Sequence, residues 1–144
     1  MIAVVDTSVW VSALINPKGF PARVVSHLQN GDFISVTSRE ILRELGDVLC
    51  RPRIKVKYGL TSEMIAFHIR QIESRSVIVP LGTPLKLCRD PWDDHLLTAA
   101  EAARANYLVS RDDDLKNDPD LLKTCAVLGI KIVSVHNFLK DLNR

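Results

Sequence analysis

Short apolar runs alternate with longer amphipathic stretches along the whole chain. Ile2–Val5 is continuously apolar, which is typical of a strand buried on both faces, and further strands are predicted at residues 33–36, 76–79, 107–109 and 131–135. Helical spacing predicts helices at residues 7–15, 20–30, 38–50, 61–73, 90–105, 119–128 and 137–142. This alternation favours βαβ units, and therefore an α/β fold class with a mainly parallel sheet.

Helix boundary signals support these assignments. Ile41, Leu45 and Leu49 recur at helical spacing within one predicted helix, and Pro52 stops it. Asp90-Pro91-Trp92-Asp93 opens a later helix with a capping residue, a proline in the first turn and an acid three residues after the cap. Residues 82–89 are predicted as a loop. No internal repeat or linker divides the sequence, so residues 1–144 are expected to form a single domain.

The composition is typical of a globular domain and not of a membrane protein. With 144 residues, 47% hydrophobic and 25% charged, the chain is long enough for one globular core. No apolar stretch approaches the ~20 residues that span a bilayer, and no signal-peptide pattern follows Met1. The cysteines Cys50, Cys88 and Cys125 match no zinc-binding spacing and cannot all pair, so we expect a reducing cytoplasm and no membrane.

The net charge of +2 is too small to indicate nucleic-acid binding through a global field. Affinity for RNA would need a local basic surface and metal ions. Arg51, Arg53, Lys55 and Lys57 alternate with other residues, and in an extended segment they would form a phosphate-contacting strip on one side. The alternative is a solvated connection in which the alternation is accidental.

Four acidic residues occur where an α/β fold would bring them together. Asp6 follows the first strand and Asp112 the fourth, whereas Glu44 lies within one predicted helix and Asp94 near the start of another. Open α/β sheets place their active crevice at the carboxyl ends of the strands. Carboxylates crowded there repel one another unless a hard divalent cation neutralises them, and Mg2+ or Mn2+ prefers oxygen ligands. The pattern therefore indicates metal-assisted cleavage of a phosphodiester.

Two of these acids have structural alternatives. Asp6 is a suitable helix N-cap, although Thr7 and Ser8 follow it and could serve in the same way. Glu44 shares a helix face with Glu40, which fits a solvated stripe paired with basic neighbours. Both remain site candidates, because Asp6 ends a strand and Glu44 borders the apolar face of its helix.

The other two acids belong to clusters. Asp90 and Asp93 account for each other as a capping box, so Asp94 is the preferred metal ligand. Asp93 is then a supporting residue. Asp112 is preferred to Asp114 because it is nearer the strand end, with Asp114 as the fallback and a solvated turn as the alternative.

The histidines show no arrangement that would activate a nucleophile. His27, His68 and His136 are isolated in the sequence and are expected at the surface or half-buried. His95 adjoins the acidic helix start, where contact with substrate is the less favoured interpretation. The sequence also has no glycine-rich phosphate loop and no CxxC pair.

Four short motifs are spread over nearly the whole chain. They are Val4-Val5-Asp6-Thr7-Ser8, Ser38-x5-Glu44-Leu45, Asp90-Pro91-x-Asp93-Asp94-x-Leu96-Leu97 and Leu108-Val109-Ser110-x-Asp112-x-Asp114-Leu115. In order and spacing this set resembles the PIN-domain ribonucleases, and especially the VapC-like toxins. One departure is Ser8, where many relatives carry asparagine.

The resemblance implies a three-layer α/β/α sandwich around a parallel sheet of about five strands. It also implies an endoribonuclease that depends on Mg2+ or Mn2+ and cleaves single-stranded or structured RNA, leaving a 5′-phosphate. The family's acidic set is matched here by Asp6, Glu44, Asp94 and Asp112, and its polar positions near the metal by Thr7, Ser8 and Ser110. Toxins of this kind form homodimers and are silenced by a small antitoxin protein, so both partners are expected.

Two other functions fit part of the pattern. Phosphoacceptor signalling domains are also α/β and gather acids around Mg2+. Their sequences have an acidic pair after the first strand and a lysine after the fifth. This chain has neither feature. A catalytically silent binding module would keep the fold without the chemistry, and the presence of all four acids argues against it.

Overall fold

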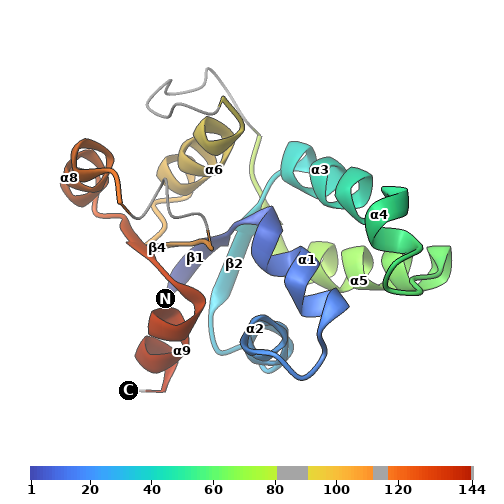
Figure 1. Ribbon diagram of the computed structural model, residues 1–144. Coiled ribbons are helices and arrows are strands. Elements are labelled where there is room, and N and C mark those ends of the chain that lie inside the picture. Colours follow the sequence, from blue (N-terminus) through green and yellow to red (C-terminus); the bar gives the residue numbers. More distant parts are fainter. Residues whose placement is uncertain (81–90, 112–116, 144) are drawn as a thin grey trace.

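Five parallel strands form the central layer of the structure (Figure 1). This computed structural model describes residues 1–80, 91–111 and 117–143, and of residues 91–94 it describes the backbone alone. The strands are β1 (Ile2–Val5), β2 (Ile34–Thr37), β3 (Ser76–Ile78), β4 (Tyr107–Val109) and β5 (Lys131–Val133). Their order is β3-β2-β1-β4-β5, and every neighbouring pair is parallel. The predicted α/β class with a five-stranded parallel sheet is confirmed.

Helices cover both faces of the sheet. They are α1 (Thr7–Ile15), α2 (Phe20–Gln29), α3 (Arg39–Cys50), α4 (Pro52–Lys55), α5 (Ser62–Ser74), α6 (Pro91–Ala102), α8 (Pro119–Val127) and α9 (Val135–Leu142). α1, α2, α5, α9 and most of α3 share one core cluster, and α6 and α8 share the other, which gives three layers (Figure 1). Across the described residues, no helix combines the length and the apolar character needed to cross a bilayer.

Alternation along the strands divides the core into these two clusters. In β1, Ala3 and Val5 join one cluster with Trp10 of α1. Val4 joins the other with Leu97 of α6. All five side chains are at most 1% exposed. β1 is therefore buried on both faces, as its unbroken apolar run predicts.

Two helix boundaries differ from the prediction for local reasons. Ser134 Oγ accepts a hydrogen bond from the backbone N–H of Asn137 at 3.1 Å, so α9 begins at Val135, two residues earlier than predicted. α6 ends at Ala102 because Arg104 adopts a left-handed conformation, with φ 53°. The predicted loop at residues 82–89 lies outside the described part of the chain.

The predicted basic strip is wrong in its geometry, because the segment that carries it is not extended. Pro52 begins α4, since the fixed φ of proline suits the first turn of a helix. The cations then lie at helical spacing and contact different groups. Lys55 Nζ donates to Ser62 Oγ at 2.9 Å, and Arg51 Nη2 lies 3.9 Å from Glu44 Oε1. The predicted strip is therefore not formed by its four residues, which are Arg51, Arg53, Lys55 and Lys57.

His68 on α5 links that helix to α1. Its Nε2 donates a hydrogen bond to the backbone carbonyl of Trp10 at 2.8 Å, and the residue is 5% exposed. The expectation of a surface or half-buried histidine is therefore wrong here. Burial lowers the pKa of His68 below its ordinary value, and the hydrogen bond to Trp10 raises it by less.

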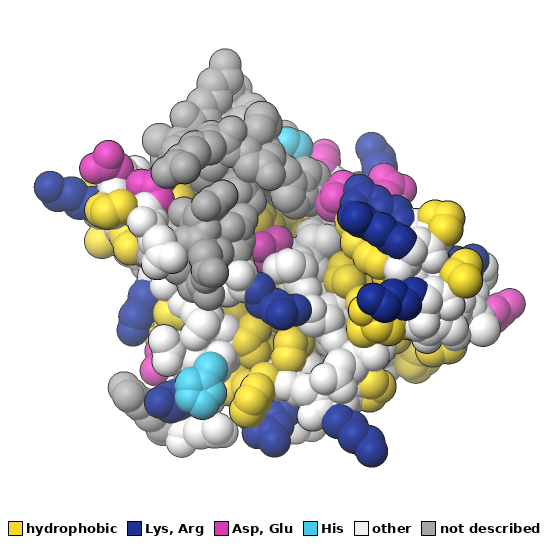
Figure 2. Space-filling model, viewed as in Figure 1, with side chains coloured by type: hydrophobic (Ala, Val, Ile, Leu, Met, Phe, Trp, Pro, Cys, Tyr) yellow, Lys and Arg dark blue, Asp and Glu magenta, His cyan; other side chains and the backbone are white. Residues whose placement is uncertain are grey.

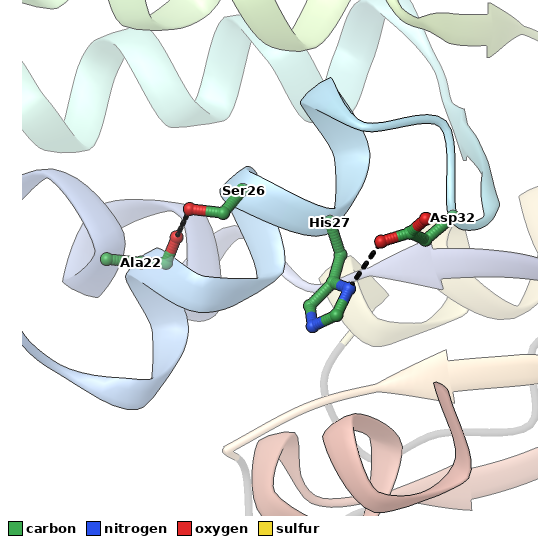
Figure 3. A network of polar contacts seen from close by, with 4 residues as sticks. All are labelled: Ala22, Ser26, His27 and Asp32. Atoms are coloured by element: carbon green, nitrogen blue, oxygen red, sulfur yellow. Dashed lines mark hydrogen bonds and ion pairs between the residues drawn. The ribbon is translucent and has the colours of Figure 1, made fainter. Parts of the chain in front are cut away.

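His27 is the half-buried histidine that the sequence predicts. Its side chain is 22% exposed, and its Nδ1 lies 2.7 Å from Asp32 Oδ2 at the turn between α2 and β2 (Figure 3). Beside it, Ser26 Oγ donates to the Ala22 carbonyl at 3.4 Å. His27 thus has an acidic partner near the surface, whereas His68 has a buried carbonyl.

We predict that His68→Gln makes the stability of the protein less sensitive to acid. Because the folded pKa of His68 is lowered, the unfolded chain takes up this proton first as the pH falls below about 6.5. The free energy of unfolding then declines by at most about 1.4 kcal/mol per pH unit. Glutamine keeps a donor for Trp10 and does not titrate. Urea denaturation from about pH 5 to 8 should show a shallower decline in the variant.

The control is His27→Gln, which should keep the part of the decline that His68 causes. Equal slopes in the wild type and His68→Gln would contradict the assignment.

Candidate functional site

The order in which strands are added to the sheet reverses between β1 and β4. From β1 the chain adds β2 and β3 on one side, and it then places β4 and β5 on the other side of β1. Open α/β sheets bind ligands at such a switch point, beyond the carboxyl ends of the strands. Asp6 follows β1 at this point, and Ser110 follows β4.

A hydrogen bond joins these two residues across the switch point. Ser110 Oγ donates to Asp6 Oδ2 at 2.8 Å, and the backbone N–H of Asp6 donates to the Val109 carbonyl at 2.8 Å. Asp6 is 6% exposed and Ser110 is 1% exposed. The carboxylate is therefore held in a fixed position at the ends of two central strands.

The Asp6 carboxylate does not cap the helix that follows it. Asp6 occupies the N-cap position of α1, with φ −63° and ψ 146°, but its side chain makes no capping hydrogen bond. The helix begins instead through its backbone, because the Asp6 carbonyl accepts a bond from Val9 N–H at 3.0 Å. The capping alternative for Asp6 is thus wrong, and its carboxylate lies toward Ser110.

Two hydroxyl groups beside Asp6 are buried without a hydrogen-bond partner among the residues that the structure describes. Thr7 Oγ1 and Ser8 Oγ are enclosed, and no described residue gives either of them a hydrogen bond. Neither of them caps α1. Thr37 Oγ1, at the end of β2, is a further hydroxyl of this kind. An unsatisfied buried hydroxyl costs about 1–3 kcal/mol, so their retention at this edge suits a ligand that supplies the missing bonds.

Glu44 lies on α3, which packs against α1. Its side chain is 32% exposed, and Oε1 lies 3.9 Å from Nη2 of Arg51, which is 47% exposed. A long, exposed ion pair of this kind contributes little and leaves the carboxylate weakly restrained. The structure thus shows Glu44 paired with a basic neighbour, as the alternative of a solvated helix face expects. A role of Glu44 in the site stays a prediction.

The first turn of α6 lies at the same edge of the sheet. This helix ends shortly before β4 begins, so its start, with Asp93 and Asp94, is directed toward the carboxyl ends of the strands. The side chains of both residues lie outside the described part of the structure. Asp112 and Asp114 lie outside it altogether. The roles of these four acids stay predictions.

Arg111 is a basic residue at the site that the sequence motifs do not reveal. It directly follows Ser110 and is exposed, and its Nη1 donates to Ser12 Oγ on α1. A cation therefore lies next to the pair formed by Asp6 and Ser110. Arg111 occupies the unspecified position x in the motif Leu108-Val109-Ser110-x-Asp112. Its location just after the end of a predicted strand was the sequence feature that could have identified it as a site residue.

The described donors suit a hard divalent cation. Asp6 supplies a buried carboxylate, and Thr7, Ser8 and Ser110 supply hydroxyl oxygens. Oxygen ligands of this type are those that Mg2+ and Mn2+ prefer. Among the side chains that the structure describes, no three acidic, histidine or cysteine groups gather into a complete metal site. Completing one would require acids beyond them.

We predict that Thr7→Val stabilises the metal-free protein. Valine has nearly the same shape and removes the unsatisfied hydroxyl, so the free energy of unfolding should rise by about 1 kcal/mol. Urea denaturation in EDTA measures this change. The control is Thr124→Val, whose hydroxyl donates to the Asp120 carbonyl at 3.0 Å and whose loss should bring no gain. A less stable Thr7→Val variant would show that this hydroxyl has a partner in the folded protein.

Comparison with known proteins agrees with the geometry. The chain is 28% identical over 143 residues to the uncharacterized protein MJ1680 of Methanocaldococcus jannaschii, covering 98% of this chain and 91% of that protein. A family model described as PIN domain matches residues 3–114, a region that runs from β1 past β4 and contains all four predicted acids. Members of this family are generally nucleases that use divalent metal ions. With most of its length matched, this chain belongs to the PIN-domain family.

Proposed function

We propose that this protein is an endoribonuclease that depends on Mg2+ or Mn2+. The observation that carries the proposal is the buried Asp6 carboxylate, which Ser110 holds at the switch point of the sheet beside unsatisfied hydroxyls. A phosphodiester bound there would meet an oxygen-rich edge and the cation of Arg111. Membership of the PIN-domain family supports the same chemistry.

We propose a role for each acid from its place in the sequence motifs. Asp6, Asp94 and Asp112 would hold the ion, and Glu44 would orient a second ion or the attacking water. Bound divalent cations polarise a phosphoryl oxygen and lower the pKa of a bound water. Ser110 keeps the Asp6 carboxylate in one orientation through its 2.8 Å hydrogen bond. Asp93 and Asp114 are proposed as supporting residues, and Thr7 and Ser8 as further oxygen donors.

We also propose a biological role for the protein. The ordered motifs resemble VapC-like toxins, so we infer a cytoplasmic, single-domain toxin that forms a homodimer. A small antitoxin protein would then be its second partner. Arg51, Arg53, Lys55 and Lys57 are proposed as separate RNA contacts, because α4 does not align them.

The strand order argues against a phosphoacceptor signalling domain. Such domains have the flavodoxin-like order 2-1-3-4-5, with the first strand next to the third. Here β1 pairs with β2 and β4, and β3 lies at the edge of the sheet. The chain therefore has the other doubly wound order, in which the strand beside β1 at the switch point is β4 and not β3.

We predict that Asp6→Asn reduces RNA cleavage by more than about 100-fold, since loss of even an outer-shell partner of a metal costs about 10–100-fold. Asparagine is nearly isosteric and its carbonyl oxygen still accepts a bond from Ser110, so the fold and the metal-free affinity for RNA should persist. A gel assay with labelled RNA in Mn2+ measures cleavage. Circular dichroism confirms the fold.

The matched control is Asp120→Asn, which removes an exposed acid in the first turn of α8 and should leave cleavage unchanged. Undiminished cleavage by Asp6→Asn would contradict the role given to this carboxylate. If the wild type binds RNA but does not cleave it in Mn2+ or Mg2+, the protein is a silent binding module.

A further inference from the structure

A groove of about 650 Å3 opens from the edge of the sheet that carries Asp6. It lies between the second half of α1, the start of α2, the turn after α4 and the start of α9, and we call it the α1–α9 groove. Residues that line it include Ser12, Phe20, Tyr58, Ser110, Arg111 and His136. Because Ser110 lines the groove and also donates a hydrogen bond to Asp6, the groove adjoins the candidate site. Its volume lies within the range of ligand pockets, about 300–1,000 Å3.

Two aromatic rings are exposed in the α1–α9 groove. Phe20 is 50% exposed and Tyr58 is 43% exposed. The rings of Phe20 and His136 are nearly perpendicular, at 77°, with centroids 5.7 Å apart, and Arg23 Cζ lies 4.9 Å from the Phe20 centroid. These contacts orient the Phe20 ring while half of the residue stays open to solvent. Exposed aromatic rings in such a setting are platforms on which unpaired bases stack.

Basic groups accompany these rings. Arg111 lines the groove, Arg23 lies over Phe20, and Lys57 Nζ lies 5.3 Å from the Tyr58 centroid. No described lining residue is Asp or Glu. Figure 2 shows basic side chains around exposed hydrophobic ones on the face that carries α1 and α2. Among the described residues, the groove therefore has basic neighbours and no acidic lining, although the net charge of the chain is only +2.

We propose that the α1–α9 groove binds the single-stranded RNA next to the scissile phosphate. Bases stack on Phe20 and Tyr58, and a backbone phosphate contacts Arg111. This proposal rests on the ribonuclease function proposed above and deepens it by naming how the substrate is held. Because the groove reaches Ser110, the contact of Asp6, one nucleotide link can lie at Asp6 while its neighbours occupy the groove. The guanidinium of Arg111 suits a phosphate because it presents several N–H donors in one plane.

The chemistry of the groove favours unpaired RNA over other polyanions. A duplex keeps its bases stacked inside the helix and presents none of them to Phe20 or Tyr58. An acidic protein segment matches the cations but not the two exposed rings. Unpaired RNA satisfies both features, because every base has a flat face and every link carries a phosphate.

Metal-free binding tests the groove separately from cleavage. A short, fluorescein-labelled, single-stranded RNA of mixed sequence is titrated in EDTA and followed by anisotropy. Phe20→Ala and Tyr58→Ala should each weaken binding by about 5- to 150-fold, the range for loss of one stacked base. Phe20→Tyr and Tyr58→Phe keep a ring and should keep the affinity. The control is Phe67→Ala on α5, which removes a 57% exposed ring that does not line the groove and should have no effect.

An RNA of the same length with abasic positions separates stacking from charge. It keeps the phosphates, so Phe20→Ala and Tyr58→Ala should lose little affinity for it. Arg111→Gln should weaken the binding of both RNAs and reduce the dependence of log affinity on log salt by about 0.7. Arg70→Gln, an exposed cation on α5, should leave this dependence unchanged.

The results separate this proposal from the ribonuclease proposal. Wild-type RNA affinity in the Phe20→Ala/Tyr58→Ala double variant, or no RNA binding by the wild type, would overturn the groove proposal even if the protein cleaves RNA. Groove-dependent binding without cleavage in Mn2+ would support the groove and overturn the ribonuclease proposal. If the double variant keeps its RNA affinity but loses a co-purifying small protein, the groove belongs to that protein and the proposal fails.

Discussion

The hydrogen bond from Ser110 Oγ to Asp6 Oδ2 is the contact on which the candidate site depends. It joins residues 104 positions apart in the sequence, and both are buried, where a hydrogen bond is electrostatically stronger than in water. The bond requires β4 to lie beside β1 with Val5 opposite Val109. A shift of one residue would move the strand ends apart and exchange the two faces of a buried strand. The register that builds the core therefore also builds the site.

The sequence predicts those elements whose signal is repeated over many residues. In β1, burial on both faces leaves an unbroken apolar run. In α3, burial of one stripe leaves an apolar residue in every helical turn. Boundaries set by one residue, such as the Ser134 cap or the left-handed Arg104, leave no such pattern. α4 has only four residues, and Pro52 signals the end of one helix as readily as the start of the next.

The site is predictable where a polar residue directly follows a strand, as Asp6 does. The α1–α9 groove is not predictable, since Phe20, Tyr58 and His136 come from three separate elements and form no motif. The burial of His68 did leave a signal. It lies between Ile65 and Ile72 at helical spacing, on the buried face of α5. The burial of a polar residue is therefore better predicted from the helix face on which it lies than from its residue type.

The far wall of the α1–α9 groove comes from a different stretch of the chain than the acids proposed for the chemistry. Ser134, Val135 and His136 come from the junction of β5 and α9, which lies beyond residue 114, where the match to the PIN domain ends. The acids proposed for the chemistry all lie before that point. The far wall of the groove can therefore be substituted without changing any of the acids proposed for the chemistry. Substitutions at Ser134, Val135 and His136 would in this way vary how a ligand is held without altering the acidic edge.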